Sequence, residues 1–162
     1  MAEDKKRGVT IVVFSGELDR ALAAFNIANT AAAMDLPVTM FFTFWGLGVI
    51  KKEEGKVGSG NWMKQMMNVM NRGGAKRLKL SKMNMGGMGT AMMKKLMTEH
   101  HMPTLGEMIK MADELGVRML ACTTSMALMG LEERDFIPEV SEFVGAATYV
   151  SNALDSDVNL FI

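Results

Sequence analysis

The spacing of apolar positions changes several times along the chain, and each change predicts a new element. The first apolar run, Gly8–Phe14, is continuous and rich in β-branched residues, which is the pattern of a strand covered on both faces. From Leu18 to Met34 the apolar positions recur at helical spacing among many alanines, which predicts a helix. Pro37 then opens a second apolar run, Val38–Phe44. Two strands joined by a helix indicate a parallel pair with a right-handed crossover.

The later part of the chain repeats this alternation less regularly. Thr104 precedes Glu107 by three residues, a capping-box pattern that predicts a helix ending near Gly116. Val117–Cys122 is the third clear apolar strand. The other predicted elements are helices at about 61–71, 90–99, 126–129 and 145–154 and a last strand at 158–162. This pattern predicts a three-layer α/β/α fold, with a mostly parallel sheet of about five strands, in a single domain over residues 1–162.

Composition removes several classes of function. The chain has 162 residues, 49% of them hydrophobic, and its 18 basic residues balance 18 acidic ones. Nucleic-acid binders usually carry a basic excess, so we expect no nucleic-acid partner. The most apolar window, 38–50, is well short of the roughly 20 residues that a membrane-spanning helix needs, so we expect no membrane span. A single cysteine excludes an intramolecular disulfide and a cysteine-rich metal site, and we expect a cytoplasmic protein without a metal or cofactor.

Cys122 lies where the third predicted strand ends and a helix follows. Ligands and reactive groups gather at the carboxyl ends of the strands in parallel α/β sheets. A thiol that faces the amide groups at the start of a helix has a lowered pKa and reacts as a nucleophile near neutral pH. Free cysteine is also a common buried hydrophobic residue, so its position alone leaves both interpretations open. Thr123, Thr124 and Ser125 supply hydroxyl groups suited to cap the following helix.

Methionine is unusually frequent, with 19 residues, ten of them between Met63 and Met97. Pairs of methionines three residues apart recur along the chain. Soft thioethers together with Cys122 are suitable ligands for Cu(I). The same spacing arises from one apolar face of a helix, which is the simpler explanation. An adaptable methionine surface at a subunit interface is a third interpretation.

A glycine-rich stretch, residues 85–90, precedes a predicted helix and contains Gly86, Gly87 and Gly89. Backbone amides at the start of a helix bind anions, but no clear strand precedes this stretch and no phosphate-binding lysine follows at a suitable distance. We therefore favour a flexible loop. His100 and His101, adjacent at the end of that helix, point to different faces of it and do not form a pair of metal ligands.

Five stretches, spread in order over nearly the whole chain, together form a specific signal. They are Phe14-Ser-Gly-Glu-Leu-Asp-Arg-Ala-Leu-Ala-Ala-Phe25, Phe41-Phe-Thr-Phe-Trp-Gly-Leu47, Lys82-Met-Asn-Met-Gly-Gly-Met-Gly89, Ala121-Cys-Thr-Thr-Ser-Met-Ala-Leu-Met-Gly130 and Val144-Gly-Ala-Ala-Thr-Tyr149. In combination they resemble the DsrE/DsrF-like family of sulfur-relay proteins, in particular a methionine-rich branch described in places as peroxiredoxin-like. The chain has no second cysteine that would resolve a disulfide, so the resemblance implies relay chemistry rather than peroxidase chemistry.

The resemblance implies a cysteine that accepts sulfane sulfur as a persulfide and passes it to a partner protein, and the family's cysteine falls on Cys122. It also implies sulfur donor and acceptor proteins as partners, and association of the chain into a homo-oligomer. In the family fold the glycine-rich loop would cover or present Cys122. The candidate partner- or substrate-binding residues are Thr123, Thr124, Ser125, Gly86, Gly87, Gly89 and Trp45.

The leading hypothesis is therefore a sulfurtransferase or sulfur carrier that uses a persulfide on Cys122. Two alternatives from other classes stay open. One is a binding module that holds a small ligand, or Cu(I) through methionine and cysteine. The other is a non-catalytic subunit whose methionine surface assembles with itself or with a partner.

Overall fold

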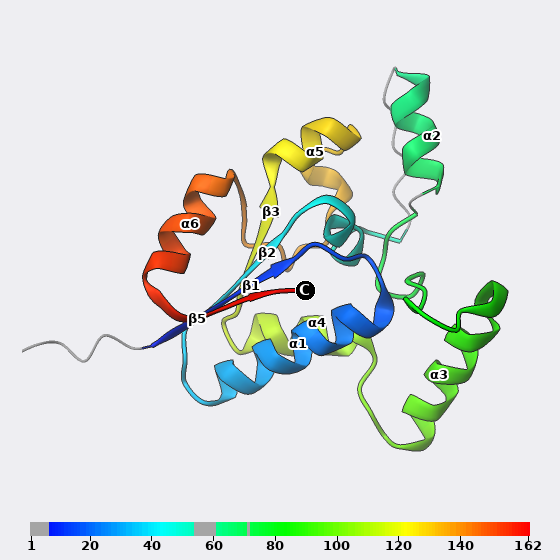
Figure 1. Cartoon of the computed structure of the whole chain (residues 1–162), viewed down its shortest axis with the longest axis horizontal. Helices are drawn as coiled ribbons and strands as arrows, with labels where there is room; N and C mark the ends of the chain where they lie inside the picture. Colours follow the sequence, from blue (N-terminus) through cyan, green and yellow to red (C-terminus); the bar gives the residue numbers. More distant parts are fainter. Residues whose placement is uncertain (1–6, 54–60, 71) are drawn as a thin grey trace, which may run out of the picture.

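The computed structural model describes residues 7–53, 61–70 and 72–162, which form a five-stranded parallel sheet flanked by helices (Figure 1). The strands are β1 (Gly8–Val13), β2 (Val38–Phe42), β3 (Arg118–Cys122), β4 (Glu142–Val144) and β5 (Ser156–Phe161). Across the sheet they lie in the order β4-β3-β2-β1-β5, and every neighbouring pair is parallel. The predicted α/β class and the mostly parallel sheet of about five strands are confirmed.

Helices cover both faces of this sheet, which gives the three predicted layers (Figure 1). Helices α1 (Leu18–Ala33) and α4 (Leu105–Glu114) pack on each other and on one face. Helix α6 (Ala146–Leu154) lies over the other face, where it contacts β1 and β5. The capping box predicted for α4 is present, because the Thr104 amide donates to Glu107 at 2.7 Å and the Glu107 amide donates back to Thr104 at 3.3 Å.

Two hydrophobic clusters follow from the alternation of side chains along the strands. The larger core, on the α1 and α4 side, includes the fully buried Ile11, Met40 and Met119. The smaller cluster, on the α6 side, is formed by the next residue of each of these strands: Val12, Phe41 and Leu120, together with Cys122. Burial on both faces explains why these strands read as continuous apolar runs in the sequence.

The turn after β2 departs from the predicted strand, which extended to Phe44. Strand β2 ends at Phe42, and Phe44–Val49 forms a short 3₁₀ helix, η1. The amide of Gly46 donates to the carbonyl oxygens of Phe14 at 2.8 Å and of Thr43 at 2.9 Å. These bonds fold the turn against the end of β1, and the absence of a side chain at Gly46 makes the close approach possible.

Three further elements differ from the sequence prediction. Helix α5 (Thr123–Met129) begins directly after Cys122, so the hydroxyl residues expected to cap it form its first turn. Strand β5 begins at Ser156, two residues earlier than predicted. Strand β4 (Glu142–Val144) was not predicted, because three residues carry no periodic signal and only pairing with β3 makes them a strand.

The methionine-rich region forms two helices at the edge of the molecule, α2 (Trp62–Met70) and α3 (Met88–Glu99), which lie to the right in Figure 1. A short 3₁₀ turn, η2 (Met85–Gly87), leads directly into α3, and another, η3 (Glu133–Asp135), follows α5. Met63 and Met88 are among the exposed methionines of this region. Within the part of the chain that the structure describes, no helix is long and apolar enough to cross a bilayer.

Substitution of Gly46 tests how tightly the η1 turn is packed against β1. A Cβ atom at this position overlaps the Val13 carbonyl oxygen, which is backbone and has no freedom to rotate away. We expect Gly46→Ala to lower the free energy of unfolding by roughly 2 kcal/mol, measured by urea denaturation. Gly106→Ala in α4 is the matched control, because nothing lies within 4 Å of the added atom. An equal effect of the two substitutions would contradict the proposed packing.

Candidate functional site

Cys122 is the last residue of β3 and the residue that precedes the first turn of α5. The register of the sheet pairs Ala121 with Phe42, so the next residues along the two strands, Cys122 and Thr43, lie beside each other at the carboxyl edge. Cys122 is only 5% exposed. The sulfur is therefore nearly covered, at the edge where reactive groups of parallel sheets gather.

Polar groups surround the sulfur of Cys122 on the α5 side. The hydroxyls of Thr43 and Ser125 lie 2.8 Å apart, and Ser125 is itself 3% exposed. Burial of the sulfur disfavours its charged form, whereas hydrogen bonds from the Ser125 amide, the Ser125 and Thr43 hydroxyls and the Thr124 amide favour the thiolate. These bonds outweigh the burial, and the pKa of Cys122 lies below the ordinary value of a cysteine thiol. A larger share of Cys122 is thus ionised near neutral pH.

Apolar groups close the opposite side of the sulfur. Leu120 and Phe41 share the cluster that contains Cys122, and the partly buried Val144 and Tyr149 pack against that cluster. The Tyr149 ring stacks on Phe41, with centroids 5.1 Å apart and planes 25° apart. Helix α6 carries Tyr149, so the position of this helix determines how well the thiol is covered.

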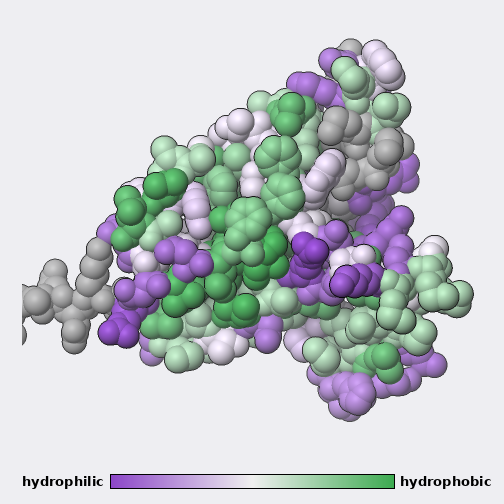
Figure 2. Space-filling model, in the orientation of Figure 1, coloured by the Kyte–Doolittle hydropathy of each residue, from purple (hydrophilic) through white to green (hydrophobic). Residues whose placement is uncertain are grey.

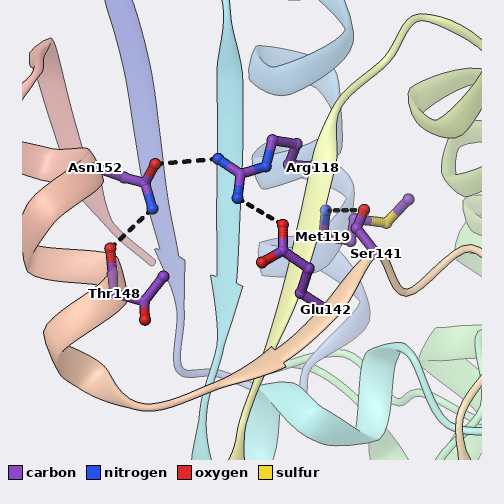
Figure 3. A network of polar contacts seen from close by, with 6 residues as sticks. All are labelled: Arg118, Met119, Ser141, Glu142, Thr148 and Asn152. Atoms are coloured by element: carbon purple, nitrogen blue, oxygen red, sulfur yellow. Dashed lines mark hydrogen bonds and ion pairs between the residues drawn. The ribbon is translucent and has the colours of Figure 1, made fainter.

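A polar network ties α6 and β4 to β3 (Figure 3). The guanidinium of Arg118, at the start of β3, donates to Asn152 on α6 at 3.1 Å and to Glu142 on β4 at 2.6 Å. Asn152 in turn donates to the Thr148 carbonyl at 2.8 Å, and the Met119 amide donates to the Ser141 hydroxyl at 3.0 Å. The network holds the α6 layer over the sheet face on which Cys122 lies.

The structure brings some of the predicted site residues together. Thr123 and Thr124 follow Cys122 directly and are exposed, while Ser125 is buried against Thr43. Trp45 lies in η1, after β2 at the same carboxyl edge of the sheet, and is partly exposed. Thr43 was not identified from the sequence. Its position directly after β2, the strand beside the one that carries the cysteine, was a signal that could have indicated it.

The predicted glycines lie elsewhere. Gly86 and Gly87 belong to η2, with φ of 70° and 103°, and Gly89 lies in the first turn of α3. In Figure 1, α3 is well separated from α5, the helix that begins at the cysteine. The structure therefore does not bring the glycine-rich stretch to Cys122. Glycine at position 89 has a local packing reason, because a Cβ atom there would overlap the Met83 carbonyl oxygen.

Two observations bear on the alternative in which Cys122 and methionines hold a metal ion. Among the described residues, no three His, Cys, Asp or Glu side chains are grouped so that they can hold a metal ion. Met126 and Met129 belong to the larger core, whereas Cys122 belongs to the smaller cluster. This pair is accounted for by the apolar face of α5. The side chains of the predicted pair Met67 and Met70 lie outside the described residues.

Comparison with models of protein families identifies the family of the chain. The model of the DsrE/DsrF/DrsH-like family matches residues 5–161. The chain belongs to this family. The resemblance to this family that the five separate stretches indicated is confirmed, because the match covers nearly the whole chain.

Individual relatives of this DsrE/DsrF/DrsH-like protein align over almost their full length. It is 44% identical over 162 residues to YrkE, an uncharacterized protein of Bacillus subtilis (strain 168), with 100% of each chain covered. It is 35% identical over 162 residues to the sulfur carrier protein DsrE2 of Allochromatium vinosum, with 99% of each chain covered.

Solved structures agree with the fold at low sequence identity. MTH1491 of Methanobacterium thermoautotrophicum, a protein of unknown function, has a TM-score of 0.53 and the YchN protein of E. coli has 0.56. Each is 12% identical, and each alignment covers 96% of this chain and 99% of the other. These two likenesses show the shared fold.

Removal of the Ser125 hydroxyl tests the origin of the lowered Cys122 pKa. Ser125→Ala removes a hydrogen bond to the thiolate, so the pKa rises and the pH profile of Cys122 alkylation moves to higher pH. At neutral pH we expect the rate with iodoacetamide to fall by roughly three- to tenfold. Thr123→Ala, which removes an exposed hydroxyl from the same turn, should leave the profile unchanged. Identical profiles for both variants and the parent chain would refute the assignment.

Proposed function

We propose that this protein relays sulfane sulfur as a persulfide on Cys122. The observation that carries the proposal is the thiol at the carboxyl edge of the sheet, where the Thr43 and Ser125 hydroxyls and the α5 amides stabilise the thiolate. A buried cysteine with a purely structural role needs none of these donors. The 35% identical relative is a sulfur carrier protein, which supports the same chemistry here.

The relay consists of two exchange steps that conserve atoms and electrons. In the first, the Cys122 thiolate attacks the terminal sulfur of a donor persulfide or polysulfide. The sulfur–sulfur bond of the donor breaks, the donor leaves as a thiolate, and Cys122 becomes Cys–S–S⁻. In the second, an acceptor thiolate attacks the terminal sulfur and Cys122 leaves as a thiolate. The reaction needs no resolving cysteine and no cofactor.

A lowered pKa of the Cys122 thiol favours both steps of this relay. It increases the thiolate fraction that attacks the donor, and it makes Cys122 a better leaving group when the acceptor attacks. The surrounding hydroxyls and amides remain in place through both steps, because Thr43 directly follows β2 at the start of η1, and Thr124 and Ser125 belong to the first turn of α5. The site is suited to passing sulfur on rather than to storing it.

The proposal implies particular surroundings for the protein. Its partners are a sulfur donor protein and a sulfur acceptor protein, and its single cysteine is best kept reduced in the cytoplasm. We also propose that the chain associates with itself, which sedimentation in solution measures directly. The transfer is equally compatible with a sulfurtransferase that turns over and with a carrier that is loaded once for each delivery.

Mass spectrometry of the loaded protein tests the first step. Incubation with inorganic polysulfide should add the mass of one sulfur atom to most chains, and treatment with excess dithiothreitol should remove it. Cys122→Ser should gain nothing, because it is the one cysteine of the chain. Thr30→Ala, which removes an exposed hydroxyl on α1, keeps the thiol and its buried donors and should load like the parent. A Cys122 that stays unmodified in the folded parent chain would sink the proposal.

A further inference from the structure

Three phenylalanine rings remain partly exposed at the carboxyl edge of the sheet, and we call them the aromatic patch: Phe14, Phe44 and Phe161. The Phe14 ring lies 5.6 Å from that of Phe44 and 5.8 Å from that of Phe161, centroid to centroid. Phe161 is 72% exposed and Phe44 is 41% exposed. Figure 2 shows hydrophobic residues gathered in this region, between α5, α6 and the C-terminus. The patch is a contiguous apolar surface that the described residues leave open to solvent.

The aromatic patch adjoins the thiol through the sheet register. Val13 pairs with Phe42, and Phe42 pairs with Ala121. One residue further along each strand stand Phe14, Thr43 and Cys122, side by side at the carboxyl edge. Thr43 joins the two sites, because its hydroxyl contacts Ser125 and the Cys122 sulfur while the next residue is Phe44.

Packed side chains lie on two other sides of the sulfur. Tyr149 and Val144 cover it from the α6 side, and Ser125 lies against it from α5. A reactant therefore approaches Cys122 across the carboxyl edge, where the Thr43–Phe44 turn and the aromatic patch lie.

The backbone conformation of Phe44 is energetically unfavourable. Its φ of 47° is in the left-handed region, which is unfavourable for a bulky side chain. The exposed ring gains little burial in return. The turn is nevertheless fixed by the hydrogen bonds that Gly46 donates to Phe14 and Thr43. Backbone strain of this kind concentrates at functional sites, where the surrounding structure over-determines it.

The size of the aromatic patch favours a transient partner over a second copy. The three partly exposed rings, together with Trp45 next to Phe44 in η1, offer on the order of 400 Å² of surface, whereas a stable interface needs about 800 Å² from each partner. The rings carry no charge, and the nearby Thr43, Thr123 and Thr124 are uncharged as well. The charged residues that follow Phe14 in the chain, Glu17 and Arg20, form an ion pair with each other. A charged segment would lose water here without gaining an unpaired counter-charge. The surface is complementary to a small, uncharged, apolar segment.

We propose that the aromatic patch selects the acceptor of the relay, a protein whose thiol is carried on an uncharged apolar segment. This inference rests on the proposed function. The flanking apolar side chains pack on the three rings while the acceptor thiolate attacks the terminal sulfur of the Cys122 persulfide. The persulfide S–S bond breaks, its electron pair leaves on the Cys122 sulfur, and the acceptor thiol becomes the persulfide. No oxidant or reductant takes part.

Single-turnover transfer to two short blocked peptides tests this selection. The protein is first loaded with inorganic polysulfide and its mass is checked. It is then mixed with a Leu-Cys-Phe or a Ser-Cys-Ser peptide, both uncharged at their flanks. We expect the apolar peptide to accept sulfur about tenfold faster. In Phe44→Asn, which tolerates the left-handed backbone, and in Phe161→Ser, the ratio of the two rates should fall toward one.

The control variant is Met34→Ser, which removes an exposed apolar side chain at the end of α1 and should keep the tenfold ratio. Loading by polysulfide should be the same in all variants, because polysulfide has no side chains to pack on the patch. Equal rates for the two peptides with the parent chain would overturn the inference while leaving the persulfide function intact. A change of sedimenting mass in Phe161→Ser, with the rate ratio kept, would also overturn it and would assign the patch to a second copy.

A separate arm covers the case in which Cys122 does not load. Alkylation of Cys122 by N-benzylmaleimide and by the hydroxyethyl analogue compares an aromatic with a polar neutral reagent. A preference for the benzyl reagent that is lost in Phe44→Asn supports selection by the patch, and the absence of any preference refutes it. A failed loading step thus sinks the proposed function alone.

Discussion

At the sulfur of Cys122 two opposing contributions meet, and the behaviour of the site depends on their balance. The apolar cluster of Phe41, Leu120 and Tyr149 takes the sulfur out of water, which disfavours a thiolate. The hydroxyls of Thr43 and Ser125, with the first amides of α5, donate hydrogen bonds that favour it. The donors outweigh the burial, so a residue that sits like a core side chain has the electrostatics of a reactive thiol.

This balance is a product of the parallel topology. Neighbouring parallel strands end at the same edge, which sets Thr43 at the end of β2 beside Cys122 at the end of β3. Helix α5 starts without a connecting loop, so its amides stand next to the sulfur. The Arg118 guanidinium donates hydrogen bonds to α6 and β4, and these bonds hold α6 over the face of the sheet on which Cys122 lies. A longer loop after β3, or an unattached α6, would separate the sulfur from either its donors or its cover.

The parts of the fold that depend on local pattern were predictable from the sequence. Gly8–Phe14, the alanine-rich helix after it and the Thr104 capping box each carry a signal within a few residues, and each is present with small shifts at its ends. Cys122 was identified because the end of a strand is marked in the local sequence, where the apolar run that ends at Cys122 gives way to hydroxyl residues. Thr43 was missed because its role comes from a residue 82 positions away, Ser125, and from the turn that Gly46 imposes. Gly86 and Gly87 were linked to the cysteine by resemblance alone, whereas their turn begins α3, on another part of the molecule.

We propose one chemical task for the carboxyl edge of the sheet: Cys122 receives sulfur, its hydrogen-bond donors keep it a good nucleophile and leaving group, and the adjoining rings meet the acceptor. Isotope-labelled polysulfide tests this most directly, by following the label by mass spectrometry from donor to protein to an added acceptor thiol. We expect the label to appear on Cys122 and then on the acceptor, at the rate at which it leaves Cys122. Label that reaches the acceptor equally fast with Cys122→Ser, or that never leaves Cys122, would contradict this task.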